Sequence, residues 1–344
     1  MKIQEIQNIK QLADLLRCKQ EFIDSIVRNG YFVTESLENH EIISNEIKKG
    51  NAVVHKFHIA KKNKSLGFRT VHEPLMDNLS NTLKILNNHL SVLYTPPSNI
   101  HGFVRGRNIK SNAEMHLGKK YILSLDIKDY FETITDNQIE KTLVSKGLSS
   151  LVSENIAKIA TIQGKLVQGF HSSPTIANLV TESMDFKLKD FCSDTIIFSR
   201  YADDMYFSSD SKIPDINKLK EIVESFGFLI NNSKTQLMLR GRKQYVTGLT
   251  VFDNLKPRIS KKVKRNLRLE IHFISKFGLE EHIMKKLGYK RHQLKDIMIR
   301  GEVYDEIEKT KLRIWGWIHF IQSIEPELGF KFEEQMKSRK YNFC

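Results

Sequence analysis

Residues 195–208 read Thr-Ile-Ile-Phe-Ser-Arg-Tyr-Ala-Asp-Asp-Met-Tyr-Phe-Ser, and this stretch decides the fold. Two apolar runs flank Ala202-Asp203-Asp204, so the pattern predicts two strands joined by a tight hairpin turn. A single aspartate suits such a turn because it tolerates left-handed backbone and caps its own chain. Two adjacent aspartates between aromatic residues place like charges close together, which costs free energy unless a cation is shared. The turn is therefore a candidate cation site, with ordinary turn capping as the alternative.

A third carboxylate, Asp126, ends another apolar run. Residues 121–127, Tyr-Ile-Leu-Ser-Leu-Asp-Ile, predict a short buried strand. Magnesium prefers a few carboxylates together with substrate phosphate oxygens. Two such ions can stabilise both the attacking and the leaving oxygen of an in-line phosphoryl transfer. Asp126, Asp203 and Asp204 together are therefore candidates to hold two Mg²⁺ ions, with Mn²⁺ as a possible substitute, but their spacing alone leaves ordinary turn capping open.

Length and composition indicate an ordinary globular protein. The chain has 344 residues, of which 40% are apolar and 27% charged, so two or three domains are expected. No run approaches the roughly eighteen apolar residues of a membrane helix, and the N-terminus lacks the pattern of a secretory signal. The three cysteines form no CxxC pair, which disfavours a cysteine zinc site. We expect a cytoplasmic protein without membrane contact.

The charge of the chain points to a polyanionic partner. Lys and Arg number 54 against 40 Asp and Glu, giving a net charge of +14. The surplus is concentrated in residues 255–344, which hold 21 Lys and Arg against 12 Asp and Glu. Residues 261–265, Lys-Lys-Val-Lys-Arg, lie in a helical pattern and predict a basic face. Contact with nucleic acid is favoured over a merely solvated helix.

Periodicity elsewhere predicts helices around a small strand region. The predicted helices span roughly residues 79–93, 137–147, 153–163, 173–191 and 215–226, and the chain beyond about residue 257 also reads as helical. A short strand is predicted at 228–230 and a hairpin near 244–249. The pattern as a whole predicts an α+β protein with an all-helical appendage.

Tyr201-Ala202-Asp203-Asp204 resembles the YxDD box of reverse transcriptases. Four further segments resemble boxes of that family and follow in its order: residues 61–74, which include Arg69; 125–131, which include Asp126; 168–178, Gln-Gly-Phe-His-Ser-Ser-Pro-Thr-Ile-Ala-Asn; and 230–235, which include Lys234. The boxes span roughly residues 55–250. One departure is Val167, where related enzymes often carry proline.

The resemblance implies a right-hand polymerase, with fingers, a palm sheet that carries the YADD hairpin, and an α-helical thumb. The expected boundaries are 1–122 for N-terminal helices and fingers, 123–252 for the palm, and 253–344 for the basic thumb. A further fingers segment near 137–170 is expected inside the palm.

The resemblance implies that Asp126, Asp203 and Asp204 are the catalytic metal ligands, and it also implies a nucleotide-binding set. It consists of Arg69, Phe131, Gln168, Gly169 and Lys234. Arg69, supported by Lys61 and Lys62, would clamp the triphosphate with its planar fork, and Lys234 would neutralise or protonate leaving pyrophosphate. Phe131 would exclude a ribose 2′-hydroxyl by sterics, with a core aromatic as the alternative. Gln168 and Gly169 would meet the nucleotide, or simply form a loop before a helix.

Two short signatures resemble the retron subgroup: Val246-Thr247-Gly248 matches its VTG string, and Asn112 to His116 matches its NAxxH string. The residues expected to contact primer or RNA are Asn112, His116, Tyr201, Val246, Thr247 and Gly248. The subgroup implies a cognate structured non-coding RNA that serves as primer and template, deoxynucleoside triphosphates as substrates, and a branched RNA-linked DNA product. It also implies an effector protein and a role in anti-phage defence.

Two alternatives remain. One is another bacterial reverse transcriptase, of the group II intron or abortive-infection type, although the two signatures and the lack of a maturase or endonuclease segment after residue 344 lead us to expect the retron type. The other is a non-catalytic RNA-binding scaffold. The presence of all three aspartates favours an enzyme over a scaffold.

Overall fold

The computed structural model describes residues 2–61 and 67–337. The chain forms two compact units, Met1–Asn108 with Tyr121–Leu237 and Ile109–Lys120 with Met238–Cys344. This division groups residues 109–120 and 238–252 with the C-terminal helices. It does not test the expected boundaries of fingers, palm and thumb, which stay predictions.

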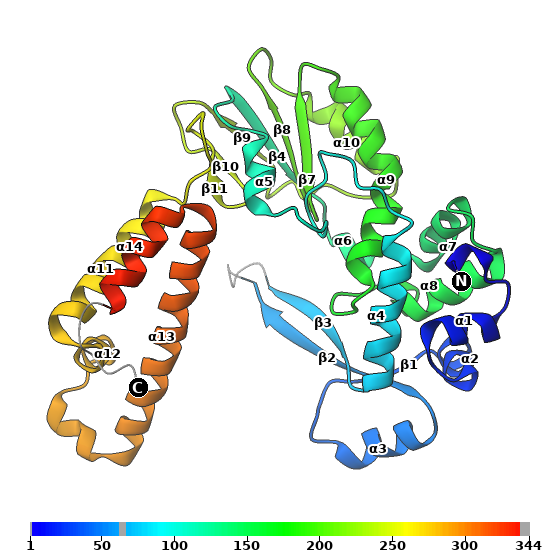
Figure 1. Ribbon diagram of the computed structural model, residues 1–344, viewed down its shortest axis with the longest axis horizontal. Coiled ribbons are helices and arrows are strands. Elements are labelled where there is room, and N and C mark those ends of the chain that lie inside the picture. The colour runs from blue at the N-terminus through cyan, green and yellow to red at the C-terminus, as the bar shows by residue number, and fades with distance from the viewer. Residues whose placement is uncertain (1, 62–66, 338–344) are drawn as a thin grey trace. The chain divides into compact units, whose positions relative to one another are not determined.

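The first unit mixes helices and strands (Figure 1). Its elements are η1 (Ile3–Glu5), α1 (Ile9–Leu16), α2 (Gln20–Asn29), β1 (Tyr31–Thr34), α3 (His40–Lys48), β2 (Ala52–Ala60), β3 (Phe68–Pro74), α4 (Asp77–Ser91), β4 (Tyr121–Asp126), α6 (Tyr130–Thr133), α7 (Asp136–Ser145), α8 (Ser150–Ala160), β5 (Thr161–Ile162), β6 (Lys165–Leu166), α9 (Ser173–Cys192), β7 (Ile197–Tyr201), β8 (Asp204–Ser209) and α10 (Ile216–Glu224). The predicted α+β class is confirmed.

The sheet that carries the three aspartates has the strand order β7-β8-β4-β9, with β9 at Gln236–Leu239. Its central strands are antiparallel, and their apolar side chains, among them Leu123, Leu125, Met205 and Phe207, are fully buried. β7 and β8 form the predicted hairpin, in which Tyr201 pairs with Asp204. The predicted strands at 121–127 and on both sides of the turn are confirmed to within a few residues.

Helix α9 covers this sheet and packs against β7, while α10 packs against α9 (Figure 1). The helix begins at Ser173 with Pro174 in its first turn, where a missing N–H is harmless. Apolar residues on α9 join the main core. Asn178, Thr181 and Asp185 are also fully buried, and their spacing of three and four places them on one helical face.

The second unit is mainly helical. Its elements are α5 (Ile109–Glu114), β10 (Tyr245–Val246), β11 (Leu249–Thr250), α11 (Lys261–Phe277), α12 (Leu279–Leu287), η3 (Arg291–Lys295), α13 (Ile297–Ile324) and α14 (Pro326–Lys337). Helix α11 buries Leu267, Ile271 and Ile274 and exposes Lys261 and Arg265, as the predicted basic face requires.

The hairpin near 244–249 is confirmed. Thr247 and Gly248 have φ values of 47° and 82°, the doubly left-handed turn that suits the twist of paired strands.

One local prediction is wrong. Residues 228–230 do not form a strand, because Ile230 makes only an isolated bridge with Ile127. The error comes from a short apolar run whose pairing depends on tertiary contacts. Helix α5 ends at Glu114, so Asn112 lies within it and His116 lies beyond it.

Candidate active site

Antiparallel pairing brings the three aspartates together. Asp126 is the last residue of β4 and Asp204 the first of β8, and the two are direct partners in the register. The backbone N–H of Ile127 donates to the carbonyl oxygen of Asp203 at 2.9 Å, which fixes the turn beside the end of β4. Asp126 is only 4% exposed. Backbone pairing thus brings Asp126 near Asp203 and Asp204, which follow it by 77 and 78 positions in the chain (203 − 126 and 204 − 126), and their catalytic role stays a prediction.

The hairpin turn holds one residue in a costly conformation. Ala202 has a φ of 56°, in the left-handed region. For a residue with a side chain this conformation costs roughly 1–2 kcal/mol. Backbone strain of this kind persists only where surrounding contacts impose it, and it is common at functional sites. The turn at Ala202 aims the following two carboxylates.

Burial and mutual repulsion disfavour the charged forms of the turn aspartates. Burial, and then the charge of Asp126, raise the pKa of Asp203. Burial, and then the charges of Asp203 and Asp126, raise the pKa of Asp204 to about 7. The positive charges of Lys234 and Arg69 act in the opposite direction on both groups. Both cations therefore lie within electrostatic reach of the aspartates.

Lys234 supplies a counter-charge within the site. Its ammonium Nζ donates to Oδ2 of Asp126 at 2.7 Å, and its side chain remains 41% exposed. Burial alone would lower the pKa of Lys234, but the hydrogen bond to Asp126 and the charges of the aspartates raise it overall. Lys234 is thus a cation at the edge of the site with a free path to solvent.

The donor set suits a hard divalent cation. Mg²⁺ prefers oxygen ligands, and the three carboxylates supply them. A bound cation would also relieve the repulsion that raises the pKa values of Asp203 and Asp204. Within residues 2–61 and 67–337, no group of three or more acidic, histidine or cysteine side chains is already gathered in ligand geometry. The ion pair between Lys234 and Asp126 would have to rearrange for Asp126 to ligate.

Replacing Asp204 with Asn should stabilise the metal-free protein at high pH. A carboxyl whose folded pKa is raised above its unfolded value of about 3.9 destabilises the fold once it ionises, so its penalty grows as pH rises from about 4 to about 7. In EDTA, we expect a Tm several degrees above wild type at pH 8 and a smaller difference at pH 5. Thermal scans at both pH values test this prediction. An equal Tm of the variant and wild type at pH 8 would show that the charge on Asp204 does not destabilise the metal-free fold.

The strand that carries Arg69 is joined to the Gln168-Gly169 loop. The backbone N–H of His72 on β3 donates to the carbonyl oxygen of Gln168 at 2.8 Å. Gly169 has a φ of 111°, and a Cβ there would lie 2.2 Å from the carbonyl oxygen of His72. Glycine is therefore required at this contact on both steric and conformational grounds. The structure therefore joins the Gln168-Gly169 loop to the strand of Arg69 through His72, and the nucleotide contacts of these residues stay predictions. Lys62 lies outside the described residues.

Phe131 lies on α6, directly after the β4 strand end. Its ring contacts Tyr130 at 5.4 Å and Phe103 at 6.0 Å between centroids. Phe131 is half-buried against the main core, whereas Phe103 is 45% exposed. A half-buried ring at this position is compatible both with packing in the core and with the predicted exclusion of a ribose 2′-hydroxyl.

The residues predicted to touch RNA fall mostly in the packing of the second unit. Asn112, His116 and Val246 are fully buried. Thr247 donates from its hydroxyl to the carbonyl oxygen of Ile109 at 2.8 Å, which ties the VTG hairpin to α5. Side chains buried in this way cannot touch RNA directly in the described conformation, so their RNA contact stays a prediction without structural support. Gly248 occupies an open position in the hairpin turn.

Tyr201 ends β7 and is half-buried directly before the turn. Its predicted contact with the primer stays a prediction.

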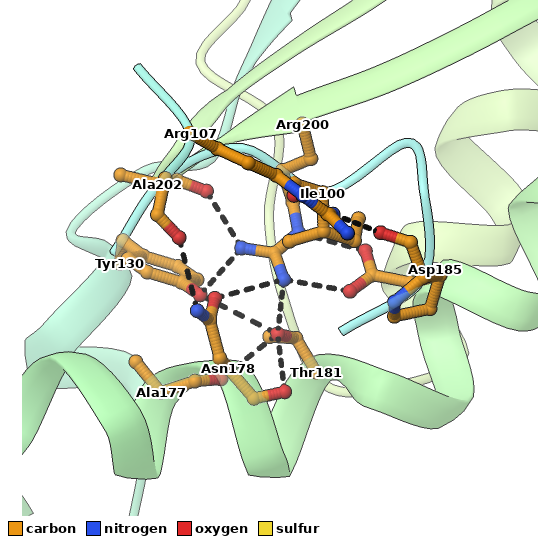
Figure 2. A network of polar contacts seen from close by, with 11 residues as sticks. Ile100, Arg107, Tyr130, Ala177, Asn178, Thr181, Asp185, Arg200 and Ala202 are labelled. Carbon is orange, nitrogen blue, oxygen red and sulfur yellow. Dashed lines mark hydrogen bonds and ion pairs between the residues drawn. The ribbon is translucent and has the colours of Figure 1, made fainter. Parts of the chain in front are cut away.

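The sequence analysis did not predict a buried polar network around Arg200, which lies next to the turn. Arg200, fully buried on β7, forms an ion pair with Asp185 of α9, and its guanidinium also reaches Tyr130 and Ala202 (Figure 2). A signal was present: an arginine within the buried strand Ile197–Tyr201 needs a partner, because an unpaired buried charge is very costly.

Comparison with known proteins adds three observations. The model of the family described as Reverse transcriptase (RNA-dependent DNA polymerase) matches residues 59–290. Retron Ec86 reverse transcriptase from Escherichia coli is 31% identical over 220 residues, covering 63% of this chain and 68% of that protein. Retron Mx65 reverse transcriptase from Myxococcus xanthus is 30% identical over 246 residues, covering 64% of this chain and 56% of that protein.

A solved structure of telomerase from Candida albicans in complex with a telomeric RNA fragment is 13% identical, with a TM-score of 0.43 over 83% of this chain and 59% of that chain. No helix in residues 2–61 and 67–337 has the length and apolar character needed to cross a membrane.

Proposed function

This chain belongs to the retron-type reverse transcriptases, which are RNA-directed DNA polymerases, and on that premise we propose that it copies a cognate structured non-coding RNA into single-stranded DNA by two-metal catalysis. The observation that carries the proposal is the meeting of Asp126 with Asp203 and Asp204 at one edge of a sheet, within electrostatic reach of Lys234 and Arg69.

Asp126, Asp203 and Asp204 are the residues proposed to hold two Mg²⁺ ions, or Mn²⁺ in their place. When bound, the two ions supply charge stabilisation for the attacking and the leaving oxygen. The raised pKa values of the two turn aspartates support this role, because carboxylates that repel one another in the free protein gain the most from a shared cation.

The chain's own residues are proposed to position the substrates. A primer hydroxyl loses its proton to water and attacks the α-phosphorus of the nucleotide. The new P–O bond forms as the bond between the α-phosphorus and the oxygen that bridges it to the β-phosphorus breaks, and pyrophosphate leaves. Arg69 binds the triphosphate with its planar fork. Lys234 offsets the charge of the leaving pyrophosphate from its position beside Asp126. Gln168 and Gly169 hold the nucleotide against β3.

Replacing Phe131 with Val is expected to weaken the rejection of ribonucleotides. The ring beside Phe103 is proposed to fill the space that a ribose 2′-hydroxyl would need, and removing that bulk abolishes a steric clash. We expect the ratio of kcat/KM for dNTP over rNTP to fall about 10- to 200-fold, the range that size discrimination in a pocket provides. Single-nucleotide extension of a primed RNA template measures it. An unchanged ratio, with DNA synthesis intact, would make Phe131 a core residue only.

In the cell, the cognate RNA is proposed to serve as both primer and template, with synthesis starting at a 2′-hydroxyl of that RNA. The product would be a branched, RNA-linked DNA. We further propose that the enzyme acts in the cytoplasm with an effector protein in anti-phage defence. Family membership supports these steps, and the basic face of α11, with exposed Lys261 and Arg265, suits a phosphate backbone.

The test is to express the protein alone and together with its neighbouring genomic region, and to extract nucleic acid with and without RNase treatment. The Asp203→Asn/Asp204→Asn double variant is the matched control, because it keeps side-chain shape and removes the charges. A discrete DNA that requires wild-type protein and stays linked to RNA until RNase or debranching establishes the proposal.

Two other results would revise it. DNA synthesis on an added primed template, with no discrete cellular product, would retain the polymerase and remove the retron activity. Co-purifying RNA without DNA synthesis in either setting would favour the scaffold alternative.

A further inference from the structure

Arg200 is the largest fully buried side chain in the described structure, and it lies two residues before Ala202 of the hairpin turn. All three nitrogens of its guanidinium donate hydrogen bonds. The fork faces α9, where Nε and Nη2 donate to the two carboxylate oxygens of Asp185 at 2.7 and 2.6 Å. Nη2 also reaches Thr181 Oγ1 at 2.9 Å and Asn178 Oδ1 at 3.2 Å. This side of the network joins β7 to the polar face of α9 (Figure 2).

The remaining nitrogen, Nη1, faces the site. It donates to the carbonyl oxygen of Ala202 at 3.0 Å and to the hydroxyl of Tyr130 at 2.9 Å (Figure 2). Ala202 is the residue in the left-handed conformation, and Tyr130 is the neighbour of Phe131. One guanidinium thus contacts both the strained peptide of the turn and the residue beside the proposed ribose-excluding ring.

A second set of contacts closes around the same turn. The backbone of Arg200 is hydrogen-bonded to the loop between α4 and α5, since its N–H donates to the carbonyl oxygen of Asn99 and its own carbonyl oxygen accepts from the N–H of His101. The side-chain amide of Asn178 donates to the carbonyl oxygen of Gly102 at 3.0 Å. That glycine lies so close to the turn that a Cβ on it would be 2.2 Å from the backbone nitrogen of Ala202. The turn is therefore enclosed by contacts from α9 and this loop.

Only arginine can make this arrangement. The guanidinium is planar and carries five donors in fixed directions, so it can bind a carboxylate bidentately and still donate to a carbonyl on its other side. Lysine has one nitrogen and would have to choose between Asp185 and Ala202. Burial alone would lower the pKa of Arg200, but the charge of Asp185 raises it overall, so the donor stays charged.

We propose that Arg200, anchored by Asp185, is a positioning residue that holds the peptide of Ala202 in its left-handed conformation and so keeps Asp203 and Asp204 directed toward Asp126. This inference rests on the proposed two-metal function. An ion pair that only stabilised the fold would not affect metal binding. In the proposed role, the hydrogen bond from Nη1 to the carbonyl oxygen of Ala202 contributes to both metal binding and catalysis.

The main variant is Arg200→Lys, which keeps a positive charge beside Asp185. The matched control is Glu182→Gln, which removes an ion pair with Lys146 from the same helix without touching the hairpin. Three properties are compared with wild type: Tm, Mn²⁺ affinity by electron paramagnetic resonance, and kcat and KM for dNTP on a primed RNA template. Hydrogen exchange of the amides of residues 201–205 reports directly on the turn.

For Arg200→Lys we expect kcat about 100-fold lower and Mn²⁺ affinity about 10-fold weaker, the range for groups that orient metal ligands. KM for dNTP should stay within about threefold and exchange at the turn should be faster. Glu182→Gln should lower Tm slightly and leave kcat unchanged, because it breaks only a partly exposed ion pair. The proposal would be overturned if folded Arg200→Lys had the same kcat and Mn²⁺ affinity as wild type. It would also be overturned if Glu182→Gln lost as much kcat as Arg200→Lys.

Tyr130→Phe keeps the inference testable if Arg200→Lys does not fold. This change removes only the hydroxyl that accepts from Nη1, and a several-fold loss of Mn²⁺ affinity with an unchanged fold is expected. No change in Mn²⁺ affinity would count against the network's role. If wild-type protein binds Mn²⁺ but makes no DNA, while Arg200→Lys still weakens Mn²⁺ binding and loosens the turn, the proposed function fails and the positioning role stands.

Discussion

Replacing Asp203 with Asn is expected to lower kcat for DNA synthesis at least about 1,000-fold, equivalent to about 4 kcal/mol of transition-state stabilisation. Asn has nearly the same shape as Asp but lacks the charge, so the turn and its hydrogen bonds can persist while a metal ligand is lost. Asp203 is already disfavoured in its charged form by burial and by Asp126, so the metal-free variant should fold at least as well as wild type. Primer extension on an RNA template in Mg²⁺ measures the effect.

Two accompanying measurements separate this loss from a folding defect. The Tm in EDTA should not fall, and affinity for RNA should stay within about threefold of wild type, because the substitution leaves the exposed cations of α11 unchanged. Retention of more than about a tenth of wild-type kcat would show that Asp203 is not a metal ligand and would return it to ordinary turn capping.

Replacing Gly102 with Ala is expected to reduce kcat about 100-fold by displacing the turn, the order of loss that a misplacement of about 1 Å causes. A Cβ at this position would lie 2.2 Å from the nitrogen of Ala202 and 2.9 Å from the carbonyl carbon of Tyr201, both backbone atoms. Either the loop or the turn must move, and overpacking of this kind also costs about 1–3 kcal/mol of stability. Steady-state kinetics and urea unfolding measure the two losses.

Gly106→Ala in the same loop is the matched control. Gly106 has a φ of 79° with nothing within 4 Å of an added Cβ, so the change introduces backbone strain without a clash. We expect a stability loss of about 1 kcal/mol and unchanged kcat. Equal activity of the Gly102 and Gly106 variants would show that the close approach of this loop does not set the position of the aspartates.

Much of the site could be predicted because its strands are locally encoded. The apolar runs around Asp126 and around Asp203-Asp204 are short and bounded by turn signals, and antiparallel pairing then places both strand ends together. The proline at position 174 marks the start of α9 for an equally local reason. In each case the physical signal lies within a few residues of the element that it specifies.

The remainder depends on contacts between distant segments. Among the side-chain partners of Arg200, Tyr130 lies 70 positions away and Asp185 lies 15 positions away, and no local pattern links them. The burial of Asn112 and His116 is likewise set by the packing of the second unit, and polar side chains in a helical pattern reveal nothing about it. Residues 228–230 have the apolar character of a strand but meet only one bridge partner.

The most direct test of the account is DNA synthesis by the purified protein on a primed RNA template with dNTPs, in Mg²⁺ and in EDTA, beside the Asp126→Asn variant. The account predicts DNA complementary to the RNA, formed only in Mg²⁺ and only by the wild type. RNA binding without any DNA product in Mg²⁺ or Mn²⁺, by wild-type protein that is folded, would contradict it and leave a scaffold with an unused trio of aspartates.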